Sequence, residues 1–411
     1  MPSLFIKNVN ILNPFSDEIL DERNVFIKGN KIDAIGVNET TLVGSYKVID
    51  GQDSFLLPGF IDSHAHIMAN GFHKAETMKN PLALHFYKAL ANMKATLDAG
   101  VTSIRGCGLA DIGVKMAQES GMIHSPRLNI SVQPLSITGG HFDFYLNSGF
   151  DMEITYPGFP SGVCDGVEGV LRKTRQVLRA QADFIKIMAS GGVLSTYTTP
   201  DAPQFNSKEL AAIVNEAKAS NRKVVAHCHS LAGMNNCIKA GVKSIEHGTF
   251  IDRKTAQAIA KKRMYLTPTL VVHHTLMKEG FPSWDAFAKE RHKKLEEVVK
   301  IQKENISIAY EEGVRFLMGS DCGVIEHGRN LGELQYLVEI GMEPIEAIEA
   351  GTIRGARFFN QDDRLGSIET GKLADLILVK GNPAEDISIL ADNDNVKKVI
   401  SDGKLVKDMI I

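Results

Sequence analysis

The sequence lacks several features that mark other classes of protein. Its 46 Lys and Arg residues against 49 Asp and Glu residues give a net charge of -3, and no block of basic residues occurs. Nothing therefore favours a nucleic-acid partner or an anionic membrane. No apolar run approaches the ~20 residues of a membrane-spanning helix. The start, Met1-Pro2-Ser3, lacks the basic and apolar stretches of a secretion signal. We expect a cytoplasmic homo-oligomer that acts on a small-molecule substrate.

Cysteine is scarce, and its spacing carries no motif. The chain has 5 cysteines in 411 residues, an odd number without any CxxC pair. A disulfide framework is not expected in a chain of this size. A GxGxxG turn after an early strand is also missing, which argues against a doubly wound dinucleotide-binding sheet.

Strand-like runs occupy both ends of the chain. Gly29-Asn30 lies between two β-rich runs, which is typical of a tight hairpin, and Asp402-Gly403 does the same near the C-terminus. The predicted strands are Ser3–Val9, Asn24–Lys28, Lys31–Gly36, Val48–Asp50, Ser54–Leu57, Asp375–Val379, Val396–Ile400 and Lys404–Val406. Because the two ends are alike in type, we predict one composite β-sandwich domain formed by residues 1–57 and 361–411.

The middle of the chain, residues 58–360, alternates short apolar strands with amphipathic helices. Eight strands are predicted, at Gly59–His64, Val101–Arg105, Arg127–Val132, Phe184–Met188, Lys223–His227, Ser244–His247, Met264–Thr267 and Arg315–Gly319. Helices are predicted between them, including Leu82–Asp98, Val167–Ala180, Ser207–Ser220 and Thr255–Lys262. This α/β alternation favours a (β/α)8 TIM barrel. The long Gly-, Pro- and aromatic-rich stretch 139–163 is predicted to be a functional loop.

Polar residues close several of these predicted strands. His64 and His66 are two residues apart at the end of the first strand, so both side chains face the same side and can share one metal. His227 and His247 each end a strand, and Asp321 follows the last one. Imidazole and carboxylate groups at the carboxyl ends of barrel strands are typical of metal sites.

Lys186 lies within an apolar strand, Phe184–Met188. Burying its charge is costly, so a lysine that reaches solvent or forms an ion pair is one interpretation. The other is a reactive or carbamylated lysine that binds metal. Taken alone, the residue favours the first interpretation.

The complete set, in this order along the strands, resembles the binuclear branch of the amidohydrolase superfamily. The run Leu57–His66 resembles the opening signature of that superfamily, and Gly366–Leu376 resembles its closing one. The resemblance implies two divalent metals, with zinc expected, and a CO2-derived carbamate on the bridging lysine. The implied ligands are His64, His66, Lys186, His227, His247 and Asp321.

Finer motifs resemble the group related to imidazolonepropionase, which includes prolidase-like dipeptidases, Xaa-Arg/Lys carboxypeptidases and ochratoxin-type amidases. These motifs are Thr138–His141, Ile185–Gly192 and Ile245–Gly248. Imidazolonepropionases proper lack the lysine ligand. The sequence departs from the group at His229, where an aromatic residue is frequent, and after Arg105, where an aspartate is replaced by Gly106. Both changes concern the expected substrate pocket.

The resemblance implies an amide hydrolase for dipeptides or N-acyl amino acids with a free C-terminal carboxylate, working through a metal-bridging hydroxide. Asp321 is the expected proton carrier, and Asp62 is expected to support a ligand histidine. The candidates for oxyanion stabilisation or substrate binding are His141, His229, Arg105, Tyr145 and His273. A purely structural hydrogen bond is an equally good interpretation of His141 and of His229. For Arg105, an ion pair inside the barrel is at least as good an interpretation as substrate binding.

Other functions remain open at this point. A lactonase or phosphotriester hydrolase could use the same two metals, because fold does not fix function. The mononuclear deaminase branch lacks the lysine, so Lys186 argues against it. A non-catalytic assembly protein is disfavoured because every ligand position is filled.

Overall fold

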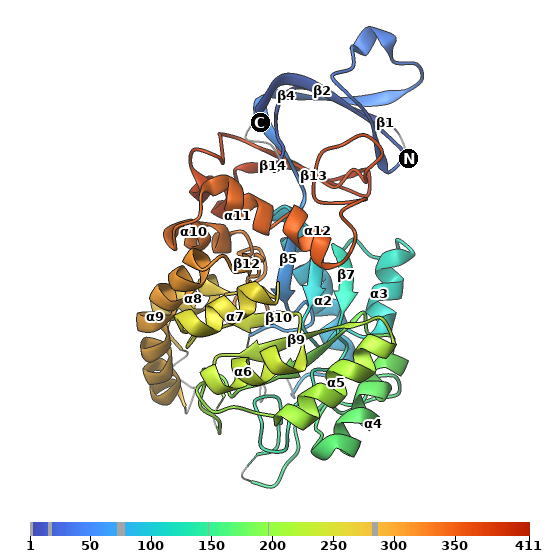
Figure 1. Cartoon of the computed structure of the whole chain (residues 1–411). Helices are drawn as coiled ribbons and strands as arrows, with labels where there is room; N and C mark the ends of the chain where they lie inside the picture. Colours follow the sequence, from blue (N-terminus) through green and yellow to red (C-terminus); the bar gives the residue numbers. More distant parts are fainter. Residues whose placement is uncertain (1–2, 15–18, 72–78, 147, 196, 282–286) are drawn as a thin grey trace.

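The computed structural model describes residues 3–14, 19–71, 79–146, 148–195, 197–281 and 287–411. The strands that sequence analysis predicted at the two ends form one small domain, which contains both termini (Figure 1). Its seven strands hydrogen-bond as one continuous sheet in the order β15-β14-β13-β4-β1-β2-β3. They are β1 (Ser3–Leu12), β2 (Ile19–Lys28), β3 (Lys31–Ile35), β4 (Tyr46–Pro58), β13 (Leu376–Val379), β14 (Val396–Ser401) and β15 (Lys404–Asp408).

Both predicted hairpins are present in this sheet. Lys28 pairs with Lys31 across Gly29-Asn30, and Ser401 pairs with Lys404 across Asp402-Gly403. The two runs predicted as separate strands before residue 58 form the single long strand β4. That strand pairs with β1 on one side and β13 on the other, and so joins the two ends of the chain.

The middle of the chain has all eight predicted barrel strands, and neighbours pair in parallel. They are β5 (Phe60–Ala65), β6 (Val101–Gly106), β7 (Arg127–Ile130), β8 (Phe184–Met188), β9 (Lys223–Cys228), β10 (Ser244–His247), β11 (Tyr265–Thr267) and β12 (Arg315–Phe316). Two runs, β5-β6-β7 and β8 to β12, are joined by parallel bridges between Leu135 and Ile187 and between Ala65 and Cys322. The (β/α)8 barrel is therefore closed.

Helices cover the outside of the barrel (Figure 1). They are α2 (Leu82–Asp98), α3 (Ile112–Glu119), α4 (Gly166–Arg179), α5 (Ser207–Ala219), α6 (Leu231–Ala240), α7 (Arg253–Lys261), α8 (Leu270–Glu279), α9 (Ala288–Glu311), α10 (Gly332–Glu339), α11 (Pro344–Ala350) and α12 (Ile353–Phe358). The four helices predicted from the sequence are present to within a residue or two at each end. The searched part of the chain contains no helix with the length and hydropathy to cross a bilayer.

The 139–163 segment contains no helix among its described residues. It follows β7 and precedes α4, so it lies at the carboxyl end of the barrel strands. Its ends are held by hydrogen bonds. Asp165 accepts from the Thr138 hydroxyl at 2.6 Å, and Glu153 accepts from the Gly162 amide at 2.8 Å. The described residues of the predicted functional loop thus lie beside the strand ends.

Candidate active site

The six predicted ligands converge at the carboxyl end of the barrel. His64 lies in β5, Lys186 in β8, His227 in β9 and His247 in β10, while His66 and Asp321 follow β5 and β12. All six line one cavity of about 710 Å³. Asp321 Oδ1 lies 3.2 Å from His66 Nε2 and 3.5 Å from His64 Nε2.

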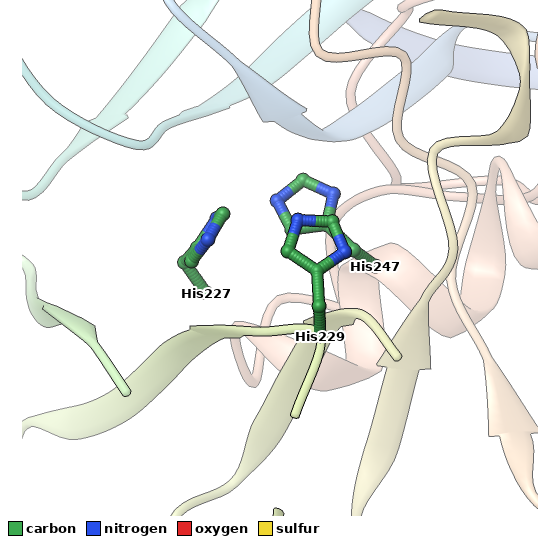
Figure 2. Close-up of side chains that lie close together, drawn as sticks. All are labelled: His227, His229 and His247. Carbon is green, nitrogen blue, oxygen red and sulfur yellow. The ribbon is translucent and has the colours of Figure 1, made fainter. Parts of the chain in front are cut away.

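Two groups of these side chains are close enough to hold an ion. The ligand atoms of His64, His247 and Asp321 lie within 4.8 Å of one another, and so do those of His227, His229 and His247 (Figure 2). The second group includes His229, which the sequence did not assign to the metal. The His229 and His247 rings are stacked, with planes 11° apart. Because a metal lies in the plane of an imidazole ligand, stacked rings do not converge on one ion. The His227 and His247 planes cross at 69°, which does allow it.

Hydrogen bonds define which nitrogen faces the cavity in three of the four candidate ligand rings. His247 Nδ1 lies 2.6 Å from the Thr269 hydroxyl, and His64 Nδ1 lies 2.7 Å from Glu246. Each of these rings is left with Nε2 for a metal. His227 is reversed, because its Nε2 lies 3.0 Å from the Gly191 carbonyl oxygen and Nδ1 remains. A partner on the second nitrogen is what orients a histidine ligand.

Burial keeps these imidazoles neutral, which is the form that binds metal. It lowers the pKa of His64 to about 4, and the Lys186 ammonium acts in the same direction. The pKa values of His227 and His247 lie well below the ordinary value for the same first reason. Burial raises the pKa of Asp321, but the His64 and His66 rings outweigh that effect, so the pKa is lowered and the carboxylate is ionised.

The surroundings of Lys186 differ from those of an ordinary lysine, which reaches solvent or forms an ion pair. Its side chain is 1% exposed, and its amine has no hydrogen-bond partner among the described residues. The structure therefore shows neither the solvent-reaching lysine nor the hydrogen-bonded ion pair that sequence analysis kept as an alternative. A buried amine that faces five potential ligands fits a metal-bridging carbamate.

Two residues of the site adopt a left-handed backbone. His247 has φ 71° and Asp321 has φ 57°, a conformation that costs ~1–3 kcal/mol in a residue with a side chain. In a regular strand Glu246 and His247 would point to opposite faces. The left-handed turn breaks this alternation, so both side chains enter the barrel.

Four of the five predicted pocket residues line the cavity: His141, Tyr145, His229 and His273. His229 Nδ1 lies 2.7 Å from the Thr249 hydroxyl, and His273 Nδ1 lies 2.7 Å from Gln302 Oε1, so each ring has one nitrogen left over. Tyr145 is 56% exposed and lies at the rim.

His141 stacks on the candidate ligand His227, with ring centroids 4.3 Å apart and planes at 19°. Gly192 makes room for it. A Cβ atom at Gly192 would come within 2.1 Å of the His141 ring. The two glycines that end the motif Ile185–Gly192 therefore have different roles. The Gly191 carbonyl oxygen contacts His227, and the missing side chain of Gly192 leaves space for the His141 ring.

Arg105 is placed differently from the other pocket candidates. It is fully buried, does not line the cavity, and its Nη2 lies 2.5 Å from Glu246. Of the two interpretations, the structure favours the ion pair inside the barrel. The prediction that Arg105 binds the substrate does not agree with this buried position. Asp62 supports His64 through the backbone, because its carboxylate accepts from the His64 amide at 2.9 Å and from the Ser320 hydroxyl at 2.5 Å.

Sequence analysis missed two features. Glu246, which holds the His64 ring, stands next to a predicted ligand, but sequence analysis gave it no role. The apolar lining was also missed. The 139–163 segment contributes much of it, through Phe142, Phe144, Leu146, Met152, Ile154 and Phe159. The concentration of aromatic and apolar residues in a segment predicted as a functional loop was the available signal.

Comparison with known proteins agrees with this geometry. The model of the "Amidohydrolase family" matches residues 55–406. The chain belongs to this family. An ochratoxinase from Aspergillus niger is 33% identical over 371 residues, which cover 86% of this chain and 75% of that protein.

Solved structures of the family superpose over nearly the whole chain. A prolidase complexed with N-methylphosphonate-L-proline matches with a TM-score of 0.90 and 32% identity, covering 99% of this chain and 100% of that one. A Xaa-Pro dipeptidase with bound methionine matches with a TM-score of 0.87 and 34% identity, covering 98% and 99%. The chain is thus a hydrolase of the amidohydrolase family, as the sequence resemblance implied.

Proposed function

We propose that this chain hydrolyses the amide bond of dipeptides or N-acyl amino acids that carry a free carboxylate. The site would hold two divalent metals, with zinc expected, on His64, His66, Lys186, His227, His247 and Asp321. The observation that carries the proposal is the buried amine of Lys186, without a hydrogen-bond partner among the described residues and in the same cavity as the other five groups. Reaction of this amine with CO2 would release a proton and give an anionic carbamate, whose oxygens could serve as metal ligands.

The substrate class is supported by relatives and by the cavity. A prolidase, a Xaa-Pro dipeptidase and an ochratoxinase are among the similar proteins. The wall formed by Phe142, Phe144 and Leu146 is apolar, so an apolar acyl group would be stabilised by about 25 cal/mol per Å² that it buries there. We keep the homo-oligomer and the cytoplasmic location as parts of the proposal, to be checked by light scattering and cell fractionation.

When bound, the two metals would supply an activated water and polarise the substrate carbonyl. The protein groups do the rest. Asp321, which is ionised and lies between His64 and His66, would accept the proton of the water and pass it to the leaving amine. His141 or His229 would donate a hydrogen bond to the oxyanion or to the substrate carboxylate. His229 can donate from Nε2 when the Thr249 hydroxyl donates to its Nδ1.

The test is a screen of zinc-loaded protein against dipeptides and N-acyl amino acids. The quantity measured is the release of the free amino acid. Turnover is expected for substrates with an apolar N-terminal or acyl part. Hydrolysis of lactones or phosphotriesters, with no amide turnover, would replace the proposal by that alternative. Bound metal without hydrolysis of any of these substrates would favour a non-catalytic assembly protein.

A further inference from the structure

A charged pair lies inside the barrel, one layer beneath the ligand set. Arg105 and Glu246 are both 0% exposed. The Arg105 Nη2 lies 2.5 Å from Glu246 Oε2 and 3.0 Å from the Thr267 hydroxyl, and the guanidinium lies 4.8 Å from the centre of the Phe358 ring. Barrel interiors are normally filled with branched apolar residues. A buried ion pair adds little stability over apolar side chains of the same size, so stability does not explain it.

The pair contacts one of the candidate ligands. Glu246 Oε2 lies 2.7 Å from His64 Nδ1, while Oε1 accepts a hydrogen bond from the Ser244 hydroxyl at 2.6 Å. The Arg105 guanidinium, which is always charged, lies 2.5 Å from Glu246 Oε2, so the Glu246 side chain is the carboxylate of a buried ion pair. A carboxylate only accepts hydrogen bonds. His64 must therefore carry its proton on Nδ1, which leaves the Nε2 lone pair on the side of Asp321.

The other ligand rings are held differently. Among the described residues, the second nitrogen of His227 contacts a backbone carbonyl and that of His247 contacts a hydroxyl, both neutral groups, while His66 Nδ1 has no hydrogen-bond partner. A charged acceptor forms a hydrogen bond about twice as strong and makes the imidazole a better donor to metal. His64 is thus the ligand ring with the most strongly fixed tautomer.

Building on the proposed function, we propose that Arg105 and Glu246 are positioning residues for the metal ligand His64. Glu246 fixes the tautomer and the orientation of the His64 ring. Arg105 neutralises Glu246, orients its carboxylate and has no contact with the substrate cavity. The metal held by His64 should therefore depend on both residues, although neither binds it.

A double variant separates positioning from stability. Removing one charge leaves the other buried and unpaired, so Arg105→Met and Glu246→Met should each lower the melting temperature and the metal content. The double variant Arg105→Met/Glu246→Met removes both charges and should recover the melting temperature. It should still bind one of the two metals at least ~10-fold more weakly in competition with a chelator. The control Thr267→Val removes the neutral partner of Arg105 and should retain both metals.

One result of the double variant would contradict the proposal. If the double variant recovers the metal affinity together with the melting temperature, the pair is merely structural. Unmodified protein that binds no metal would overturn the proposed function instead. The inference is then decided on the same unmodified protein by NMR of ¹⁵N-labelled histidine, with the His64 signal assigned by its loss in His64→Asn. A proton on Nδ1 is expected, and a proton on Nε2 would refute the role of Glu246 whether or not metal binds.

Discussion

The two ends of the barrel differ in whether their lysine side chains have hydrogen-bond partners. At the carboxyl end, Lys186 is completely enclosed and its amine has no hydrogen-bond partner in the described part of the chain. At the amino end, Lys223 begins β9, donates to the Phe358 carbonyl oxygen, and lies 4.8 Å from the centre of the Phe358 ring. Two lysines on neighbouring strands thus have different surroundings. Lys223 has its partners in place, whereas Lys186 is the lysine to which the proposed function assigns the chemistry.

The contact between the barrel and the sheet domain shows the same contrast. At the amino end, Arg127 at the start of β7 binds Asp375 at 2.8 Å and Asp402 at 2.7 Å. These contacts fasten the barrel to the sheet domain. The unmatched amine of Lys186 therefore lies where ligands would bind, and matched charges lie where the two domains meet.

The largest effect is expected from Lys186→Ala. A methyl group cannot bridge two cations, so elemental analysis should find one metal or none in place of about two per chain. The value of kcat/KM should fall by more than ~100-fold, because even the partners of metal ligands account for 10–100-fold. Short carboxylic acids added in solution should restore part of the activity by filling the gap.

The matched control is Lys223→Met, at the other end of the barrel. It should cost stability and leave the metal content unchanged. If both lysine variants keep their metals and their rates, Lys186 is not carbamylated and the contrast between the two ends disappears.

A second, smaller effect is expected from Gly192→Ala. The new methyl would lie 2.1 Å from the His141 ring, so the ring must leave its place against His227. Losing one hydrogen bond to a charged group costs ~1.5–3 kcal/mol, or roughly 10–100-fold in kcat/KM. Metal content should stay normal. Gly169→Ala is the control, since nothing lies within 4 Å of its Cβ position. Unchanged kinetics in Gly192→Ala would exclude a role for His141.

Much of the fold was predictable, because it depends on local patterns. Apolar runs between turn residues predicted all eight barrel strands, and Gly29-Asn30 and Asp402-Gly403 predicted the two hairpins. That the six candidate ligands lie in one cavity agrees with the set that the resemblance to the amidohydrolase superfamily implied. The contact between the barrel and the sheet domain at the amino end was not predictable. Arg127 and Asp375 are far apart in sequence, and no local pattern pairs them.

The site was less predictable where the backbone leaves its regular path. Glu246 faces inward because the next residue adopts a positive φ, and strand periodicity gives no sign of such a turn. The partner of Arg105 could not be chosen either, because an inward arginine fits a substrate and an ion pair equally well until the carboxylate is located.

A third prediction concerns the substrate. If His141 or His229 binds the substrate carboxylate, amidating that carboxylate removes a charge-assisted hydrogen bond. The loss should be at least ~1.5 kcal/mol, or roughly tenfold in kcat/KM. His229→Ala should abolish the preference for acid over amide if His229 is the anchor, and His141→Ala if His141 is. Equal rates for acid and amide in the unmodified enzyme would contradict the dipeptidase proposal and favour lactones or phosphotriesters.

The smallest effect on chemistry is expected at the amino end. Arg127→Met breaks the contact between barrel and sheet domain, so the free energy of unfolding should fall. Breaking a fully buried pair costs ~3–5 kcal/mol. Arg127 and Asp402 are 24% and 39% exposed in their side chains, so solvent reduces this to about 1–3 kcal/mol. Denaturant titration measures it. Metal content and kcat/KM should be unchanged, and a loss of metal would show that the two ends are coupled.

The same variant has a pH signature. Burial raises the pKa of Asp402, but hydrogen bonds from Arg127 and Asn30 outweigh this and hold it below the ordinary value of 3.8. A carboxyl whose folded pKa is lowered stabilises the protein fully above its unfolded pKa, and the stabilisation is lost as the pH falls through the folded value. The stability difference between the unmodified protein and Arg127→Met should therefore be constant near neutral pH and shrink below about pH 4. A difference that persists in acid would mean that Arg127 acts through packing or through Asp375, and not through the ionised Asp402.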